Sequence, residues 1–128
     1  MDYVEISKTV IDSILTHARV SYPDEGILLL RGKATKQLIT VDSVVLPPLA
    51  IRNRHQTSFP LGMLPIDYAI VGTAHSHPSG TLEPSVTDLN AFYGKVMVIV
   101  AYPYESEADL ACFDRDGKRT KYQIRVSS

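Results

Sequence analysis

The sequence predicts a mixed α/β fold of the α+β-like kind, with a β-sheet between helices. Three observations predict it. Apolar residues recur at helical spacing within residues 7–22. Several later segments are rich in the β-branched residues that favour strands. Residues 96–101 form an uninterrupted apolar run, which is typical of a central strand buried on both faces.

The first part of the chain predicts a helix followed by two strands. The helix would bury one face, formed by Val10, Ile11, Ile14, Leu15 and Ala18. Pro23 would end this helix, since proline cannot continue the hydrogen-bonded pattern. The short apolar run 26–30 predicts a buried strand, and residues 37–46 predict a second one, joined to the first by a hairpin through residues 33–36.

Residues 47–65 interrupt the regular pattern. Repeated prolines favour an extended, partly irregular segment, in which we expect one short strand near residues 56–59. Residues 68–77 resemble a strand that leads into a loop. Residues 85–93 then predict a short helix closed by Gly94.

The last part of the chain predicts a β-hairpin. Asp116-Gly117 is a strong turn signal, because the tightest hairpin turns need positive φ angles. The flanking strands are expected at residues 109–113 and 120–126. Cys112 falls in the first of them and is most simply a core residue.

Composition narrows the class of protein. A chain of 128 residues with 45% hydrophobic and 21% charged residues is expected to form one ordinary globular domain. A formal net charge of −1 gives no basic field for nucleic acid, so no nucleic-acid partner is expected. The single cysteine excludes an intramolecular disulfide and a thiolate-rich zinc site. No apolar stretch approaches the roughly 20 residues of a membrane span, and no signal peptide is apparent, so we expect a soluble cytoplasmic protein without a membrane partner.

One cluster of residue types points to a metal. In an extended strand His75 and His77 would project from the same face, with Cβ atoms about 7 Å apart, so the two imidazoles can converge on one ion. Asp88 lies eleven positions after His77, beyond a Pro- and Gly-containing segment that can turn the chain back. It could supply a third ligand at the start of the predicted helix. Nitrogen and oxygen ligands of this kind suit zinc.

Each half of this cluster also has a simpler interpretation. Two histidines at alternate positions are often just polar residues on one side of a strand. Ser85 followed three residues later by Asp88 resembles a capping box, in which each side chain bonds the other residue's backbone N–H. A helix cap without a metal is therefore the alternative at this stage.

Taken together, the residues resemble the signature of the MPN+/JAMM metalloprotease family, which consists of an upstream Glu, His-x-His-Pro and a later Ser-x-x-Asp. The matching residues, in order, are Glu25, His75, His77, Pro78, Ser85 and Asp88. Glu25 is favoured as the upstream Glu because it directly precedes the strand at residues 26–30, whereas Glu5 precedes the first helix. The resemblance implies one MPN/JAMM domain over residues 1–128, with a cytidine-deaminase-like mixed sheet flanked by helices. The length of this chain resembles that of the compact archaeal and bacterial members of the family.

The resemblance also implies an activity. It implies a zinc-dependent isopeptidase or peptidase that cleaves after the C-terminal Gly-Gly of a ubiquitin-like or small sulfur-carrier protein. One Zn²⁺ per chain would be held by His75, His77 and Asp88. Glu25 would act as general acid and base, and Ser85 would stabilise the oxyanion. The extended tail would bind by β-addition, with candidate contacts at Thr57, Ser58 and Phe59.

Two other functions stay open. MPN domains also serve as noncatalytic protein-binding scaffolds, although those commonly lack the metal ligands that occur here. The same motif resembles RadC-type proteins, which implies a role in DNA metabolism. Other hydrolase classes are disfavoured because the chain has neither His-Glu-x-x-His nor a Gly-x-Ser-x-Gly nucleophile elbow.

Overall fold

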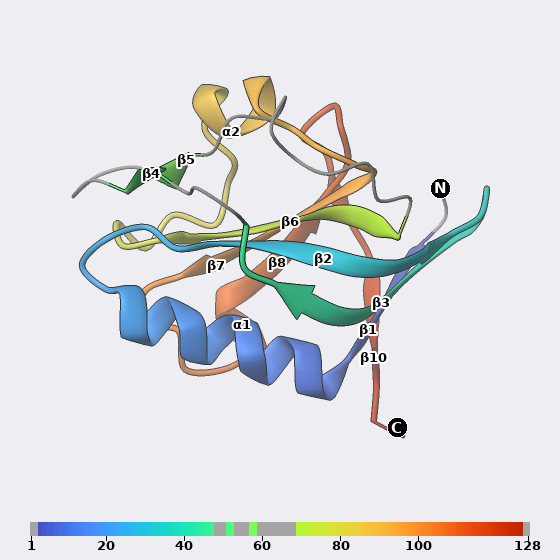
Figure 1. The fold of residues 1–128 in the computed structure, drawn as a ribbon, viewed down its shortest axis with the longest axis horizontal. Coiled ribbons are helices and arrows are strands. Elements are labelled where there is room, and N and C mark those ends of the chain that lie inside the picture. Colours follow the sequence, from blue (N-terminus) through green and yellow to red (C-terminus); the bar gives the residue numbers. More distant parts are fainter. Residues whose placement is uncertain (1–2, 48–50, 53–56, 59–68, 127–128) are drawn as a thin grey trace.

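The fold is seen in a computed structural model, which describes residues 3–47, 51–52, 57–58 and 69–126. A curved mixed sheet lies between α1 (Lys8–Ser21) on one side and α2 (Val86–Asn90) on the other (Figure 1). The predicted fold class, a sheet between helices, is confirmed. Within the described residues, no helix has the length and apolar character required to cross a membrane.

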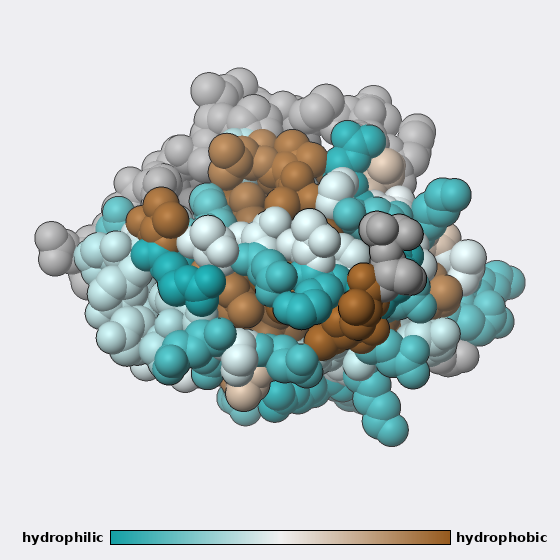
Figure 2. Space-filling model, turned by 90° about the horizontal axis from the view of Figure 1, so that it is seen from below, coloured by the Kyte–Doolittle hydropathy of each residue, from teal (hydrophilic) through white to brown (hydrophobic). Residues whose placement is uncertain are grey.

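The first helix follows from its sequence pattern. The Ser7 hydroxyl accepts a hydrogen bond of 3.1 Å from the Val10 N–H and so caps the N-terminus of α1. The helix ends at Ser21, shortly before Pro23, as predicted. Figure 2 views the side of the molecule on which α1 lies, and the exposed surface there is largely hydrophilic with separate hydrophobic patches. The helix therefore buries its apolar face against the sheet, and the polar face meets solvent.

The main sheet contains both parallel and antiparallel pairs. Its order is β10-β1-β3-β2-β6-β7-β8-β9. Its strands are β1 (Tyr3–Ser7), β2 (Ile27–Ala34), β3 (Leu38–Val45), β6 (Ile70–His77), β7 (Val96–Ala101), β8 (Leu110–Phe113), β9 (Arg119–Thr120) and β10 (Tyr122–Arg125). A separate two-stranded ribbon is formed by β4 (Ile51–Arg52) and β5 (Thr57–Ser58), and a short 3₁₀ helix, η2, covers Glu107–Asp109.

The sheet curls until its two edges meet. β9 and β10 lie at opposite ends of the strand order, yet only Lys121 separates them in the chain. The hairpin prediction is confirmed for β8 and β9, whose turn contains Gly117 at φ +79°. The prediction of one strand over residues 120–126 is wrong, because the chain leaves β8 after Thr120 and pairs with β1 instead.

Other boundaries also differ from the sequence predictions. β1 and β4 were not predicted, whereas β5 falls within the predicted 56–59 region. β2 continues to Ala34, so the turn to β3 is shorter than the predicted 33–36 hairpin. α2 ends at Asn90 rather than at Tyr93.

Gly94 does not close the helix but allows two strands to meet. Its φ is +84°, and a Cβ at this position would lie 2.5 Å from the Val71 carbonyl oxygen. The next residue, Lys95, donates its backbone N–H to that same oxygen at 2.7 Å. Glycine is therefore needed where the chain enters β7 against β6.

The core has a layer on each side of the sheet. The larger layer packs the buried face of α1 against one face of the strands and includes Ala74, Val98 and Val100. The smaller layer, on the opposite face, consists of Met97, Ile99, Ala111 and Phe113, with Leu82 and Phe92 packed against it. β7 contributes alternate residues to both layers, which confirms the predicted central strand.

Candidate metal centre

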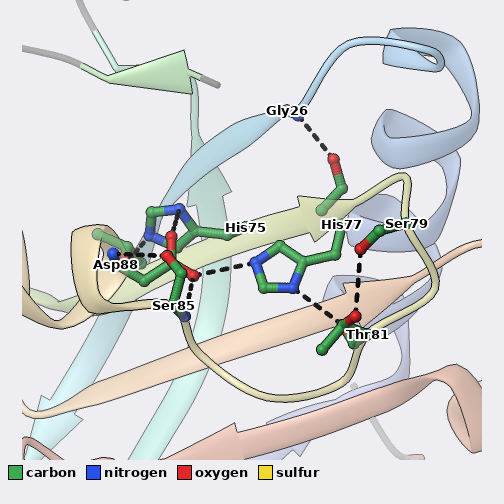
Figure 3. A network of polar contacts seen from close by, with 9 residues as sticks. Gly26, His75, His77, Ser79, Thr81, Ser85 and Asp88 are labelled. Atoms are coloured by element: carbon green, nitrogen blue, oxygen red, sulfur yellow. Dashed lines mark hydrogen bonds and ion pairs between the residues drawn. The ribbon is translucent and has the colours of Figure 1, made fainter. Parts of the chain in front are cut away.

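Three separate segments bring polar side chains to the end of β6. β6 supplies His75 and His77. Ala74 lies in the core layer that packs against α1, and because side chains alternate along a strand, both histidines face the opposite side of the sheet. β2 pairs antiparallel with β6, with Ile27 opposite His75, so Glu25 comes beside His77. The loop after β6 leads into α2, whose first turn carries Asp88 (Figure 3).

His77 is held between a carbonyl and a carboxylate. Its Nδ1 lies 2.9 Å from the Thr81 carbonyl oxygen, and its Nε2 lies 3.0 Å from Asp88 Oδ2. A carbonyl oxygen can only accept, so Nδ1 carries a hydrogen and donates it. The second ring nitrogen, Nε2, faces a carboxylate oxygen, which also only accepts. A cation is required between these two atoms, either a proton or a metal ion.

The pKa of His77 reflects this arrangement. Burial lowers the pKa, but the hydrogen bond and negative charge of Asp88, with a smaller contribution from the Thr81 carbonyl, outweigh burial and raise it. Asp88 thus favours a positive charge on the ring or next to its Nε2. A bound metal ion would supply that charge in place of the proton, which is the behaviour expected of a metal ligand.

His75 lies on the other side of the carboxylate. Its Nδ1 is 3.8 Å from Asp88 Oδ1, and its Nε2 is 3.0 Å from the Thr73 hydroxyl. Burial lowers the pKa of His75 to about 4, so the ring is neutral near pH 7. A neutral imidazole has the lone pair that metal binding needs, and Thr73 can fix its orientation by accepting from the opposite nitrogen.

Asp88 connects the helix cap to the histidines. Its Oδ2 accepts a 2.9 Å hydrogen bond from the Ser85 N–H, and its own N–H donates to Ser85 Oγ at 3.0 Å. The capping box proposed as the alternative is therefore present. It does not replace the histidine contacts, since Oδ2 also meets His77 and Oδ1 faces His75. Burial raises the pKa of Asp88, but the hydrogen bond from His77, the charge of His75 and the Ser85 N–H outweigh burial and lower it to about 2.

Glu25 stands at the mouth of the site. One potential ligand atom from each of Glu25, His77 and Asp88 lies within 4.8 Å of the others. Glu25 is partly buried, and this burial is the main cause that raises its pKa to about 7, with a smaller contribution from Asp88 and an opposing one from His77. His75 is not part of this tightest group. The geometry alone thus allows either His75 or Glu25 as the third ligand.

An open cleft gives access to these groups. Its volume is about 650 Å³. Its lining includes Pro23, Glu25, His77, Pro78, Ser79, Thr81, Glu83, Pro84 and Ser85. Ser85 lies on this wall and its oxygen accepts from the Asp88 N–H, so its hydroxyl can still donate a hydrogen bond into the cleft. The site can therefore hold a cation, a proton-exchanging carboxylate and a hydroxyl donor side by side.

The remaining predicted site residues belong to the segment between β3 and β6. Thr57 and Ser58 form β5, and Phe59 lies outside the described residues. Their role as substrate contacts stays a prediction.

Two residues that orient the histidines were missed by sequence reasoning. Thr73 lies two positions before His75 on the same face of β6, so strand alternation could have found it. Thr81 acts through its backbone carbonyl, for which the sequence has no signal.

Comparison with known proteins agrees with this fold and site. The chain matches the family described as prokaryotic homologs of the JAB domain over residues 7–116. A Haloferax volcanii protein described as a probable metalloprotease is 30% identical over an alignment of 124 residues. This match covers 91% of this chain and 76% of that protein.

Solved structures show the same relationship. A JAB1/MPN domain protein from Archaeoglobus fulgidus is 33% identical with a TM-score of 0.68, over 96% of this chain and 99% of that one. A structure described as JAMM, a metalloprotease-like zinc site in the proteasome and signalosome, is 29% identical with a TM-score of 0.68, over 96% of this chain and 98% of that one.

The fold and the site thus define a metal-binding, metalloprotease-like domain of the JAMM/MPN class. The chain belongs to the family of prokaryotic homologs of the JAB domain, as the His-x-His-Pro and Ser-x-x-Asp pattern predicted.

Proposed function

We propose that this chain is a zinc-dependent isopeptidase or peptidase that cleaves after the C-terminal Gly-Gly of a ubiquitin-like or small sulfur-carrier protein. The observation that carries the proposal is the meeting of His77 Nε2 and Asp88 Oδ2 at 3.0 Å beside the Glu25 carboxylate in an open cleft. The descriptions of the Haloferax and JAMM relatives support a metalloprotease. The Gly-Gly substrate is implied by the family resemblance.

The donor set fits one zinc ion per chain. His75 and His77 offer nitrogen, and Asp88 offers a carboxylate oxygen whose low pKa keeps it ionised. When bound, zinc supplies Lewis-acid polarisation of the scissile carbonyl and lowers the pKa of water. Thr73 and Thr81 keep the two imidazoles oriented, as is usual for the groups behind metal ligands.

Glu25 provides the proton exchange. A carboxyl with a pKa near 7 can accept a proton from the attacking water and return it to the leaving amine at neutral pH. This role requires hydrogen-bond reach to the reacting atoms and does not require metal ligation. Ser85 donates a hydrogen bond from its hydroxyl to the oxyanion, a contribution of roughly 3 kcal/mol for a well-placed donor.

The cleft is suited to an extended tail with small side chains. Pro23, Pro78 and Pro84 contribute to its walls, and proline rings hold their backbone in a narrow range of φ. Two glycines at the end of a carrier protein would present backbone without side-chain bulk. We propose that backbone hydrogen bonds hold this tail, with Thr57, Ser58 and Phe59 as further contacts.

The test uses carrier proteins that end in Gly-Gly, joined either to a lysine side chain or to a peptide extension. Zinc-loaded wild-type protein is expected to release the carrier at the Gly-Gly carboxyl, as measured by intact mass, and a chelator is expected to stop the reaction. Glu25→Gln should bind zinc but lose most of the cleavage. Comparing the two kinds of conjugate separates deconjugation from processing.

Three outcomes would contradict the proposal. Cleavage that resists the chelator would exclude a metal-dependent reaction. Equal cleavage by wild type and Glu25→Gln, with zinc bound in both, would remove Glu25 from its role. Failure to bind any divalent metal would instead favour the noncatalytic scaffold.

A further inference from the structure

Ser76 lies between the two site histidines but faces the opposite side of β6. His75 and His77 point to the cleft side of the sheet, so Ser76 points to the side that packs against α1. Only 3% of Ser76 is exposed. A polar side chain so deeply buried is expected to have a specific hydrogen-bond partner.

That partner is the residue after Glu25. The Ser76 hydroxyl accepts a 2.6 Å hydrogen bond from the Gly26 N–H (Figure 3). In addition, the Ser76 N–H donates to the Gly26 carbonyl at 3.1 Å. The regular register between β2 and β6 reaches Ile27 opposite His75. Ser76 therefore extends the attachment of β2 to β6 by one residue, up to the peptide that carries Glu25.

α1 closes the other side of this attachment. A Cβ on Gly26 would lie 2.9 Å from Ser21 Oγ and 3.0 Å from the His17 ring. The space left between Gly26, Ser76 and His17 is only about 10 Å³. Gly26 is thus confined between β6 and α1. This confinement restricts the backbone position of the preceding residue, Glu25.

We propose that Ser76 is a positioning residue for Glu25, because its hydroxyl holds Gly26 and thereby sets where the Glu25 carboxylate stands relative to His77 and Asp88. The catalytic part of this inference rests on the proposed function. Ser76 faces away from the cleft and touches no reacting group. A carboxylate displaced by about 1 Å can lower the rate of a reaction by roughly 100-fold, so this one contact matters.

The test compares Ser76→Ala with Val41→Ala in the zinc-loaded protein. Val41 is fully buried in β3, so its truncation is a matched control for lost core stability. Ser76→Ala is expected to lower kcat by roughly 10- to 100-fold with little change in KM or zinc affinity, since it leaves all proposed ligands in place. Val41→Ala is expected to keep the wild-type kcat.

A double variant distinguishes positioning from a general structural role. In a Glu25→Gln background, Ser76→Ala should cause no further loss of rate, because the group it positions is already inactive. An additional loss equal to that in wild type would overturn the inference. If Ser76→Ala does not fold, Ser76→Cys tests the same point, since sulfur is a weak acceptor of similar size.

A measurement without catalysis separates this inference from the proposed function. The Gly26 amide of wild type should exchange slowly with solvent deuterium, and much faster in the Ser76 variant. A crystal structure of the variant should show the Glu25 carboxylate displaced from His77 and Asp88. If wild type cleaves no Gly-Gly substrate, the proposed function fails, but these two measurements still decide the inference. An unmoved Glu25 or a rapidly exchanging wild-type Gly26 amide would overturn it.

Discussion

At the scale of single residues, Asp88 connects the helix cap of α2 to the two histidines of the candidate metal centre. One oxygen accepts from the Ser85 N–H and lies 3.0 Å from His77 Nε2, and the other faces His75. Only 6% of the residue is exposed, and a buried carboxylate is costly unless it is paired. The helix cap and the metal-site interpretation of the Ser-x-x-Asp motif are therefore compatible, because the cap fixes the carboxylate that the histidines meet.

The first prediction concerns which side chain completes the metal site. His75→Ala and Asp88→Asn are expected to lower zinc affinity by more than roughly 100-fold, since loss of even an orienting partner costs 10- to 100-fold. Glu25→Gln should leave affinity within a few-fold of wild type. Competition with a chromophoric chelator measures all three. Glu83→Gln is the matched control, because Glu83 lines the same cleft but is not one of the three clustered residues Glu25, His77 and Asp88. A large loss in Glu25→Gln with none in His75→Ala would assign Glu25 as the ligand.

The second prediction concerns the only thiol. Cys112 is fully buried in β8, and burial raises its pKa to about 12, so the thiol stays protonated until the pH approaches that value. We expect almost no reaction with a thiol reagent at about pH 8 in native protein and rapid reaction after unfolding, since the thiolate is the nucleophile. Fast labelling of native protein, followed by mass spectrometry, would show that β8 opens locally.

At the scale of secondary-structure elements, two serines cap helices in the same way but in different surroundings. Ser7 accepts from Val10 N–H at α1, and Ser85 accepts from Asp88 N–H at α2. Ser7→Ala and Ser85→Ala should each lower the free energy of unfolding by about 1 kcal/mol. Only Ser85→Ala should also lower kcat, by roughly 100-fold or more, if its hydroxyl stabilises the oxyanion. Equal kcat values for the two variants would show that Ser85 only caps α2 and does not stabilise the oxyanion.

Gly94 and Gly80 separate backbone strain from steric conflict. Both have positive φ, +84° and +86°, but a Cβ on Gly80 would have no contact closer than 3.6 Å, whereas on Gly94 it would lie 2.5 Å from the Val71 carbonyl oxygen. Gly80→Ala should therefore cost about 1 kcal/mol of stability, which is the usual penalty of this conformation. Gly94→Ala should cost markedly more, on the order of 3 kcal/mol. Urea unfolding measures both, and similar losses would mean that β6 and β7 separate easily at this point.

Elements with strong local signals were predictable from the sequence. α1 has a regular apolar face, and β7 has an uninterrupted apolar run, so periodicity was sufficient for both. The two-residue strand β4 has too few positions for a period. The end of α2 was misplaced because Gly94 looked like a helix cap, whereas its conformation serves the contact with Val71.

The site was predictable in part for a similar reason. His75, His77 and Asp88 belong to one compact motif, and the structure brings them together at the end of β6. The position of Glu25 depends on the pairing of β2 with β6, which is a long-range contact. The carbonyl of Thr81 and the attachment of Gly26 to Ser76 involve backbone atoms, and amino-acid type says little about these.

At the scale of the whole molecule, closure of the sheet could not be predicted from the local sequence pattern. Residues 120–126 have the character of one strand, but Thr120 pairs with Cys112 while Tyr122 pairs with Val4. Arg125 adds ion pairs to Asp42 and Glu5, so side chains of β10 reach both β3 and β1. Such solvent-accessible pairs contribute little to stability. Besides the backbone pairing of β10 with β1, we expect the closure to depend mainly on apolar packing.

Ile124 and Val126 test that conclusion. Ile124, in β10, is partly buried against the α1 layer of the core, whereas Val126 lies just past the strand with 78% of its surface exposed. Ile124→Ala should lower the free energy of unfolding by about 2 kcal/mol, toward the low end for buried Ile because burial is incomplete. Val126→Ala should change it by less than about 0.5 kcal/mol. Urea denaturation with an unchanged m-value gives both numbers. Equal, small effects would show that β10 is a loosely attached edge and that the sheet is stable without closure. The expected difference would instead make the last strand part of the structure that supports β1 and, through β3, the strand β2 that Glu25 precedes by two residues.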